Sequence, residues 1–256
     1  MKPALAYFSF AEITDRTKHH EFNEYHQLDH RPENLALPGV IFGERWVRTP
    51  DCAQALPTAA TDFASVHYMT MYWLREPVET SRLEWMDFGT TATHLGRRPD
   101  LNWATRPLVA PFVPLKGYVN RRVLVSEEAL PFRPTRGIFV TVTKLGDNLG
   151  ASERLARWYD RVRVPNILEC RGVAGAWTFV SEDAYPARRS PGSSAGGPGI
   201  RVHVYFLDQD PLLFAEDLLA RRNTWEPPEE IDVETPLFTS VLRTIVPWEW
   251  DWFDRS

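Results

Sequence analysis

The sequence contains little cysteine and no long apolar run. Its 256 residues include only two cysteines, Cys52 and Cys170, too few and too far apart for a disulfide framework or a CxxC metal site. The apolar runs fall short of the roughly 18–20 residues that a membrane span requires. No small-residue cleavage site follows the opening MKPALAYFSFAEI, so we interpret it as a strand and not as a signal peptide. These absences predict a cytoplasmic protein without membrane contact.

An excess of basic residues and the common nucleotide-binding motifs are also absent. Lys and Arg number 29 against 34 for Asp and Glu, a net charge of −5, so nucleic acid is not expected as a partner. There is no GxxxxGKS/T, no GxGxxG after a strand and no GxSxG, which disfavours nucleotide cofactors and acyl-enzyme chemistry. His19, His26 and His30 recur on roughly one helix face, but without an HExxH motif we expect no metal.

What remains is the composition of a folded globular chain, 43% hydrophobic and 25% charged, and within it one segment repeats. The stretch HRPENLALPGVIFGERW, from His30 to Trp46, aligns with RVPNILECRGVAGAWTF, from Arg163 to Phe179. The same register places Leu5 on Ile138. About forty residues correspond in this way, which indicates an internal repeat.

Two further pairs extend the repeat. Val66-His67 aligns with Val202-His203, and Arg121 aligns with Arg243. We therefore expect two homologous halves, 1–126 and 137–256, joined by a linker at 127–136. The second half carries a Ser-, Gly- and Pro-rich segment at 182–199, which we expect to be a flexible loop.

Each half has the pattern strand, helix, strand, strand, helix, strand. In the first half this predicts helices over Lys18–Leu35 and within Val78–Leu95, with strands at Leu5–Phe10, Val40–Val47, Ser65–Leu74 and Gly117–Val125. In the second half it predicts a second helix within Leu212–Asn223 and strands at Ile138–Thr143, Val173–Val180, Arg201–Leu207 and Thr239–Val246. This order is the ferredoxin-like split βαβ motif, so the expected class is α+β.

The helix ends WYDRVRVPNILECRGV (158–173) and YHQLDHRPENLALPGV (25–40) carry a family likeness. They resemble the dimeric α/β-barrel superfamily and specifically its EthD-like members. The resemblance implies two fused ferredoxin-like repeats that form a single barrel with helices outside. Families of this architecture include cofactor-free monooxygenases, lactone isomerases, polyketide cyclases and dehydratases, stress-response proteins and haem enzymes, so the fold does not select an activity.

One position distinguishes the halves. Where the resembling families commonly place a His just before the helix-ending Pro, the first half has His30 and the second has Arg163. The resemblance therefore implies an active site in the first half.

Candidate catalytic residues gather on the first helix. His26 and His30 are four residues apart, Asp29 lies beside them, and a His has the pKa suited to moving a proton near neutrality. The alternative is a polar helix end exposed to water. On the third strand of each half we expect His67 and His203 to point into the barrel lumen. His67 would act with Tyr25 or Tyr7, unless the recurrence of these histidines is inherited structure.

Candidate binding residues come from the strands. Arg121 can bind a carboxylate or an enolate through its planar fork, with an ion pair to a neighbouring acid as the alternative. Trp46 and Met69 can line a pocket for a flat apolar ligand, although large aromatics are mostly core. We also assign His203 and Tyr7 to substrate binding. The tail WEWDWF predicts an edge strand or an arm that docks on a partner chain in a homodimer.

The resulting hypothesis is a cofactor-independent enzyme for a small hydrophobic, aromatic or polyketide-like metabolite. A first-half histidine moves a proton in a dehydration, isomerisation or cyclisation, while an Arg or Tyr stabilises the developing oxyanion. Two alternatives stay open: a barrel enzyme that binds haem through a histidine, and a ligand-binding or stress-response protein without catalysis.

Overall fold

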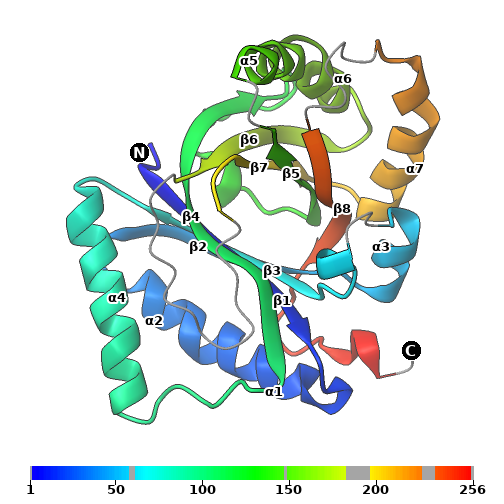
Figure 1. The fold of residues 1–256 in the computed structure, drawn as a ribbon. Coiled ribbons are helices and arrows are strands. Elements are labelled where there is room, and N and C mark those ends of the chain that lie inside the picture. The colour runs from blue at the N-terminus through cyan, green and yellow to red at the C-terminus, as the bar shows by residue number, and fades with distance from the viewer. Residues whose placement is uncertain (1, 58–60, 147–148, 183–196, 227–233, 255–256) are drawn as a thin grey trace.

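Eight antiparallel strands close into one barrel in the order β1-β3-β2-β8-β5-β7-β6-β4 (Figure 1). The computed structural model describes residues 2–57, 61–146, 149–182, 197–226 and 234–254. The strands are β1 Leu5–Ile13, β2 Val40–Val47, β3 Tyr68–Leu74, β4 Ala104–Val119, β5 Gly137–Leu145, β6 Val173–Ser181, β7 Ile200–Leu207 and β8 Glu234–Thr244.

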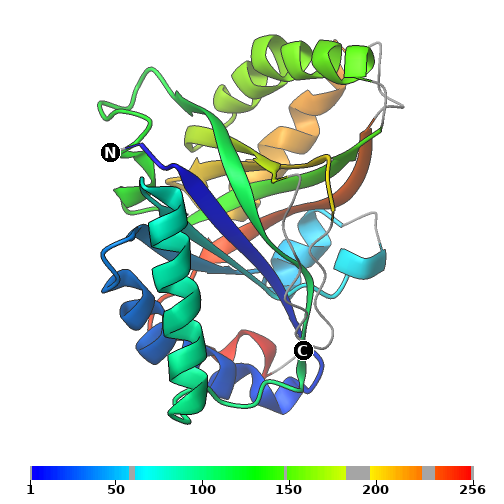
Figure 2. The ribbon, with the colours of Figure 1, turned by 60° about the vertical axis from the view of Figure 1, so that its left-hand side comes forward.

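The helices lie outside the barrel. Figures 1 and 2 show α1, α2 and α4 on one side and α5, α6 and α7 on the other. The first group comprises α1 His19–Glu24, η2 Tyr25–His30, α2 Arg31–Leu35 and α4 Val78–His94, whereas the short α3 Pro50–Ala55 packs on α7 and β8. The second comprises α5 Leu149–Trp158, η5 Tyr159–Arg163, α6 Val164–Leu168 and α7 Pro211–Arg221. Single turns are η1 Arg16–Lys18, η3 Thr61–Phe63, η4 Leu130–Phe132, η6 Arg222–Thr224 and η8 Asp251–Phe253. The predicted α+β barrel of two βαββαβ units is confirmed.

The barrel interior is packed with apolar side chains from all eight strands. Phe8, Trp73, Trp177 and Phe206 belong to this one core cluster, as expected for an eight-stranded barrel whose interior is just wide enough for side chains to fill. Trp46 and Met69, which the sequence assigned to substrate binding, belong to the same core cluster and are 1% and 0% exposed. We find these two residues in the core, at a distance from solvent.

The fourth strand differs from the prediction. It spans Ala104–Val119, whereas the sequence pattern placed it at Gly117–Val125. The prediction followed the alignment of Arg121 with Arg243, and the strand contains Pro107, Pro111 and Pro114, although proline cannot donate to a sheet ladder. Strand β4 accommodates them because its ladder with β1 ends at Phe112 and its ladder with β6 begins there, so among the described strands each part of β4 pairs along one edge. Arg121 therefore lies beyond the strand, exposed in the following turn.

The repeat alignment is out of register at two strands. Ala6 pairs with Trp73 and Ile138 with Phe206, and all four face the interior. Ala6, and not Leu5, thus corresponds to Ile138. Trp73 and Phe206 occupy equivalent positions, so the residues three places before them, Thr70 and His203, are equivalent as well. His203 therefore corresponds to Thr70 and not to His67.

The expectation that His203 points into the lumen is wrong. Its neighbours Val202 and Val204 belong to the interior cluster, and side chains alternate along a strand. The imidazole of His203 instead lies on the outer face, where it stacks on Tyr159 of η5 with ring centroids 4.6 Å apart. His67 is not in the lumen either, since its ring packs on His19 of α1 and on Phe253 of η8.

The aromatic tail folds back onto its own chain. Within it, Asp251–Phe253 forms a single helical turn and not an edge strand. The ring of Phe253 stacks on His19 at 4.0 Å. Most of the expected loop at 182–199 lies outside the described residues. No helix in the described part of the chain combines the length and the apolar character needed to cross a membrane.

Candidate functional site

A cavity of about 410 Å³ lies between the first-half helices and the outer face of the barrel, not in the lumen. Its volume is in the range of small-molecule pockets. The helices α1, η2, α2 and α4 form one wall, and strands β1, β3 and β4 form the other. The lining residues are Tyr7, Phe8, Ser9, Ala11, Phe22, His26, His30, Asn34, Thr70, Tyr72, Trp85, Met86, Phe88, Gly89, Thr90, Thr93, His94, Arg98, Arg106 and Val109.

A π-helical turn shapes the helical wall. Between α1 and α2 the residues Tyr25–His30 form a π-helix, and the backbone N–H of Arg31 donates to the carbonyl of His26, five residues earlier. Residues five apart in an α-helix lie about 140° apart around the axis, but the wider turn brings Tyr25 and His30 together. Such turns are rare and occur frequently at functional sites.

Hydrogen bonding fixes the tautomer of His26. Its Nδ1 lies 3.0 Å from the carbonyl oxygen of Phe22, and because a carbonyl only accepts, Nδ1 carries the proton. The Nε2 atom therefore keeps its lone pair. Burial, reinforced by the positive charge of Arg45, holds the pKa of His26 well below its ordinary value, so the ring is neutral at pH 7.

His30 has the opposite tautomer. Its Nδ1 lies 3.2 Å from the amide nitrogen of Asn34 and 3.4 Å from the hydroxyl of Tyr25. The orientation of the amide is set by Trp85 of α4, whose Nε1 donates to the Asn34 oxygen. An amide nitrogen only donates, so Nδ1 of His30 accepts and Nε2 carries the proton. Burial and the charge of Arg98 lower the pKa of His30 to about 3.

The two imidazoles form an acceptor and donor pair at one wall of the cavity. Their ring centroids are 5.5 Å apart and the rings are nearly perpendicular. His26 offers a lone pair at Nε2, and His30 offers an N–H at Nε2. This arrangement can accept a proton at one atom of a bound molecule and stabilise negative charge at another.

The structure brings together some of the predicted site residues. His26, His30 and Tyr7 line the cavity, and Tyr25 contacts His30 from behind. Asp29 is exposed and is not among the lining residues.

Other predicted residues lie elsewhere. His67 is at the start of β3, where its Nδ1 accepts from the backbone N–H of Ile13 at 3.0 Å and burial lowers its pKa to about 4. Trp46 and Met69 are in the barrel core, His203 is in the second half, and Arg121 is exposed. Arg243, which the sequence alignment paired with Arg121, lies on β8 and makes ion pairs of the kind expected as the alternative, with Asp51 at 2.9 Å and Asp210 at 2.8 Å.

Sequence reasoning missed the contribution of α4 and of the segment that follows it. The α4 lining positions include two series with a spacing of four residues, Trp85, Gly89 and Thr93, and Met86, Thr90 and His94. That spacing is a helix-face signal that was available in the sequence. Arg98 and Arg106 carry no such signal, because Arg98 reaches the cavity on the segment after α4 and Arg106 on the long β4 strand.

The corresponding face of the second half is filled. Phe139, Leu155, Tyr205 and Phe214 form a buried cluster between sheet and helices. Tyr159, at the start of the second π-helix, donates from its hydroxyl to Glu234 at 2.5 Å. The halves thus share their element order but differ in what occupies the space under the helices.

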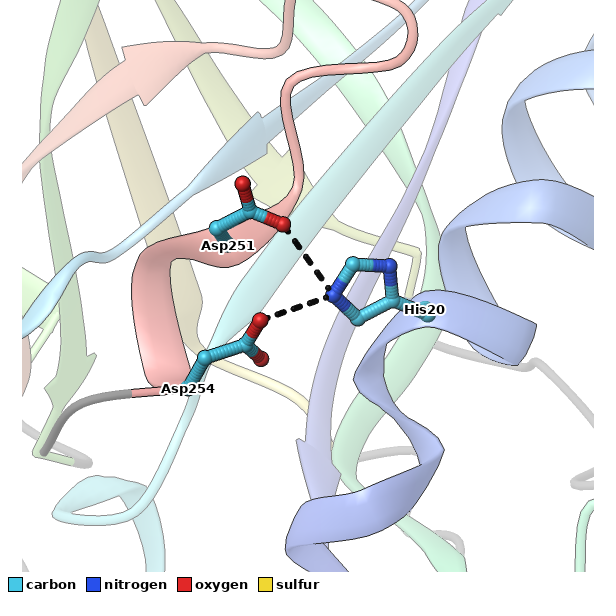
Figure 3. Close-up of side chains that lie close together, drawn as sticks. All are labelled: His20, Asp251 and Asp254. Carbon is cyan, nitrogen blue, oxygen red and sulfur yellow. Dashed lines mark hydrogen bonds and ion pairs between the residues drawn. The ribbon is translucent and has the colours of Figure 1, made fainter.

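A second polar cluster fastens the C-terminal turn to α1 (Figure 3). Nε2 of His20 lies 3.4 Å from Oδ1 of Asp251 and 3.3 Å from Oδ2 of Asp254. It is the one group of metal-ligating side chains with suitable spacing among the described residues. All three side chains are about half or more exposed, at 50%, 81% and 49%, so we interpret the cluster as a surface clamp.

No protein-family model and no curated protein sequence matches the chain. Several solved structures do. An anthrone oxidase-like protein matches with a TM-score of 0.51 and 9% identity, over 96% of this chain and 92% of that one. A chlorite dismutase variant from Candidatus Nitrospira defluvii gives 0.51 and 9%, over 100% and 96%. A putative chlorite dismutase gives 0.50 and 11%, over 100% and 99%. At such identities the likeness shows the fold, an α+β barrel built from ferredoxin-like units.

Proposed function

We propose that the chain is an enzyme that moves protons on a small, largely apolar molecule held in the first-half cavity. The observation that carries this proposal is the pair of neutral histidines, His26 and His30, whose hydrogen bonds give them opposite tautomers. Perturbed titratable groups that converge in a cavity are typical of catalytic sites. The chemistry needs only these side chains, as expected for a cofactor-independent reaction.

In this mechanism Nε2 of His26 accepts a proton from an acidic C–H or O–H of the substrate. The N–H of His30 donates a hydrogen bond to the oxygen on which negative charge develops. Return of the proton to another carbon gives an isomerisation, and its delivery to a departing hydroxyl gives a dehydration. Attack of the carbanion on a carbonyl within the same molecule gives a cyclisation. Asn34 and Tyr25 act as positioning residues, because they hold His30 in its tautomer.

The cavity walls support an aromatic or polyketide-like substrate. Tyr7, Phe22, Tyr72 and Trp85 surround the histidine pair, and Tyr7 and Trp85 pack with centroids 4.1 Å apart. Flat aromatic surfaces favour flat ligands through offset and edge-on contacts.

We further infer an EthD-like origin by duplication, with halves 1–126 and 137–256 and a linker at 127–136. The repeated element order and the π-helix at the same place in each half support this. Association into a homodimer stays a prediction.

Proton transfer is tested most directly by isotope exchange. Aromatic and polyketide-like ketones with an acidic C–H are incubated with the protein in D₂O, and deuterium incorporation is followed by mass spectrometry. We expect His26→Gln to lower the exchange rate by about 10²–10⁴-fold, while His20→Gln, on the exposed clamp, leaves it unchanged. Full exchange by folded His26→Gln and His30→Gln proteins contradicts the proposal. A co-purified ligand that is bound but never altered favours the non-catalytic alternative.

The lone pair of His26 also supports a second candidate, a haem protein. His26, a neutral imidazole whose Nδ1–H is anchored on a carbonyl, would be the residue that holds the iron, and Arg98 and Arg106, which line the same cavity, would pair with the acidic side groups of haem. Bound haem would supply redox chemistry at its iron. Addition of hemin tests this: a Soret shift in the wild type that is lost in His26→Ala supports it, and no shift in the wild type excludes it.

A further inference from the structure

Two arginines in the cavity wall have no acidic partner. Arg98 and Arg106 both line the cavity, and no hydrogen bond or ion pair joins either of them to another described residue. No Asp or Glu is among the lining residues. The cavity thus presents two guanidinium groups and, within the described chain, no carboxylate.

Arg106 is the more enclosed of the two. Its side chain is partly buried, and desolvation, reinforced by the charge of Arg98, lowers its pKa to about 10. A charge removed from water is costly unless it is paired. Two other partly buried arginines of the described chain satisfy this rule, Arg31 with Glu44 at 3.0 Å and Arg82 with Glu182 at 2.7 Å.

A β-bulge aims Arg106 at the cavity. Phe10 pairs with Leu108 and Glu12 with Thr105, so Arg106 and Pro107 together oppose the single residue Ala11. Leu108 faces the barrel interior, and in a regular strand Arg106, two residues away, would face it too. The extra residue turns Arg106 to the outer face instead, which is a recognised effect of bulges near functional sites.

Arg98 reaches the same region from the segment after α4. Its Nη1 lies 3.8 Å from the place where a Cβ on Gly89 would stand, so it lies over the glycine that faces the cavity. The charges of both arginines also act on His30 and lower its pKa. The arginines and the histidine pair therefore belong to one electrostatic environment.

We propose that Arg106 and Arg98 form an anion subsite and that the ligand is an aromatic carboxylate. A guanidinium presents a planar fork that matches a carboxylate with two hydrogen bonds, and the aromatic walls accept the ring. The proposal rests on the function proposed above only in taking this cavity as the substrate site. It adds the charge of the substrate and the residues that recognise it.

A matched pair of probes tests the charge. 2-Naphthoate and 2-naphthamide have the same ring system and differ in charge, and their binding is followed through tryptophan fluorescence at low salt. We expect the wild type to bind the carboxylate at least tenfold more tightly than the amide. Arg106→Gln should abolish the difference and leave the amide affinity unchanged within twofold. Arg97→Gln is the control, because Arg97 pairs with Glu33 and is not a lining residue.

Stability supplies a second readout. An unpaired, partly buried cation destabilises the protein, so Arg106→Met should raise the Tm by about 2–4 °C. Arg45→Met should lower it, because the buried Arg45 donates to Gln27 and Asn23. A structural Arg106 would behave as Arg45 does.

Each outcome decides between the two proposals. Equal affinity for both probes, binding of neither, or a carboxylate preference that survives in Arg106→Gln overturns the anion subsite, as does a lowered Tm in Arg106→Met. Proton exchange that depends on His26 can persist in those cases. Conversely, a carboxylate preference without any exchange retains the subsite and overturns the proposed enzyme activity.

Discussion

Tyr25 and His30 are five residues apart, yet their rings stack at 25° with centroids 5.5 Å apart. The π-helical turn makes this contact, and the Tyr25 hydroxyl is 3.4 Å from Nδ1 of His30. Asn34 approaches the same nitrogen from the next turn and is held in turn by Trp85. The tautomer of His30 thus depends on Tyr25 behind the cavity wall and on Asn34 and Trp85 within that wall.

The first prediction concerns Asn34. Replacement by Leu leaves the Trp85 indole N–H without its acceptor and frees His30 to change tautomer. We expect the free energy of unfolding to fall by about 1–3 kcal/mol, as measured by urea denaturation, and proton exchange to fall as well. Tyr25→Phe removes only the longer contact and should cost less than Asn34→Leu on both readouts. A reversed order would contradict this account of His30.

The second prediction is a loss of stability in mild acid. Burial lowers the pKa of five of the seven histidines, to about 4 for His19 and His67, to about 3 for His30 and His203, and well below the ordinary value for His26. Below the unfolded pKa of about 6.5 the unfolded chain binds protons that the native state does not. Stability is therefore complete above pH 6.5 and declines as the pH falls toward 4.

Each such histidine contributes a slope of about 1.4 kcal/mol per pH unit in that window. Urea unfolding at pH 7.5, 6 and 5 measures the total slope. His203→Phe should reduce the slope by about one histidine equivalent, since its ring packs on Tyr159 in a buried cluster. Equal free energies of unfolding at pH 7.5 and pH 5 would contradict the prediction.

The third prediction separates binding from folding at Gly89. A Cβ built there meets only Arg98, at 3.8 Å, and glycine inside a helix costs about 0.5–1 kcal/mol relative to alanine. Gly89→Leu should preserve or raise the Tm while it fills the cavity and weakens naphthoate binding at least tenfold. Gly43→Ala is the contrast, because its Cβ would overlap the ring of Tyr72. Gly43→Ala should therefore lower the Tm. Naphthoate binding that is undiminished in Gly89→Leu would show that the ligand binds outside this cavity.

The fourth prediction concerns how the C-terminal turn is held. Phe253 is buried against His19 and His67, whereas the clamp formed by His20, Asp251 and Asp254 is exposed. We expect Phe253→Ala to cost about 3 kcal/mol or more and His20→Ala less than 1 kcal/mol. Denaturation curves of the two variants, recorded in low and in high salt, measure both losses of unfolding free energy. A larger loss for His20→Ala would show that the charges dominate.

The fold could be predicted from the sequence because its signals are local. The Pro, Leu and Gly-Val spacing after the first helix occurs in each half, and the strand and helix order follows from side-chain periodicity. The failures have physical causes. The alignment of Arg121 with Arg243 displaced the fourth strand along the sequence, and a slip of three residues paired His67 with His203.

The candidate site was predictable only in part. His26 and His30 are adjacent through the helix itself, so their shared location was accessible. The π-turn that orients them was not, because it depends on tertiary packing more than on propensity. Arg106 reaches the cavity through a bulge in a strand that the sequence had placed elsewhere, and Arg98 arrives on the segment before it. Such residues meet only in three dimensions.

Strand β4 spans the boundary between the two halves. One part of it pairs with β1 and carries Arg106, and the other pairs with β6 of the second half. In the second half, buried apolar side chains fill the space between the sheet and the helices. Its strand β6 therefore holds the far end of the strand that carries Arg106. The strand that carries Arg106 is thus anchored at its other end by β6, none of whose residues lines the cavity.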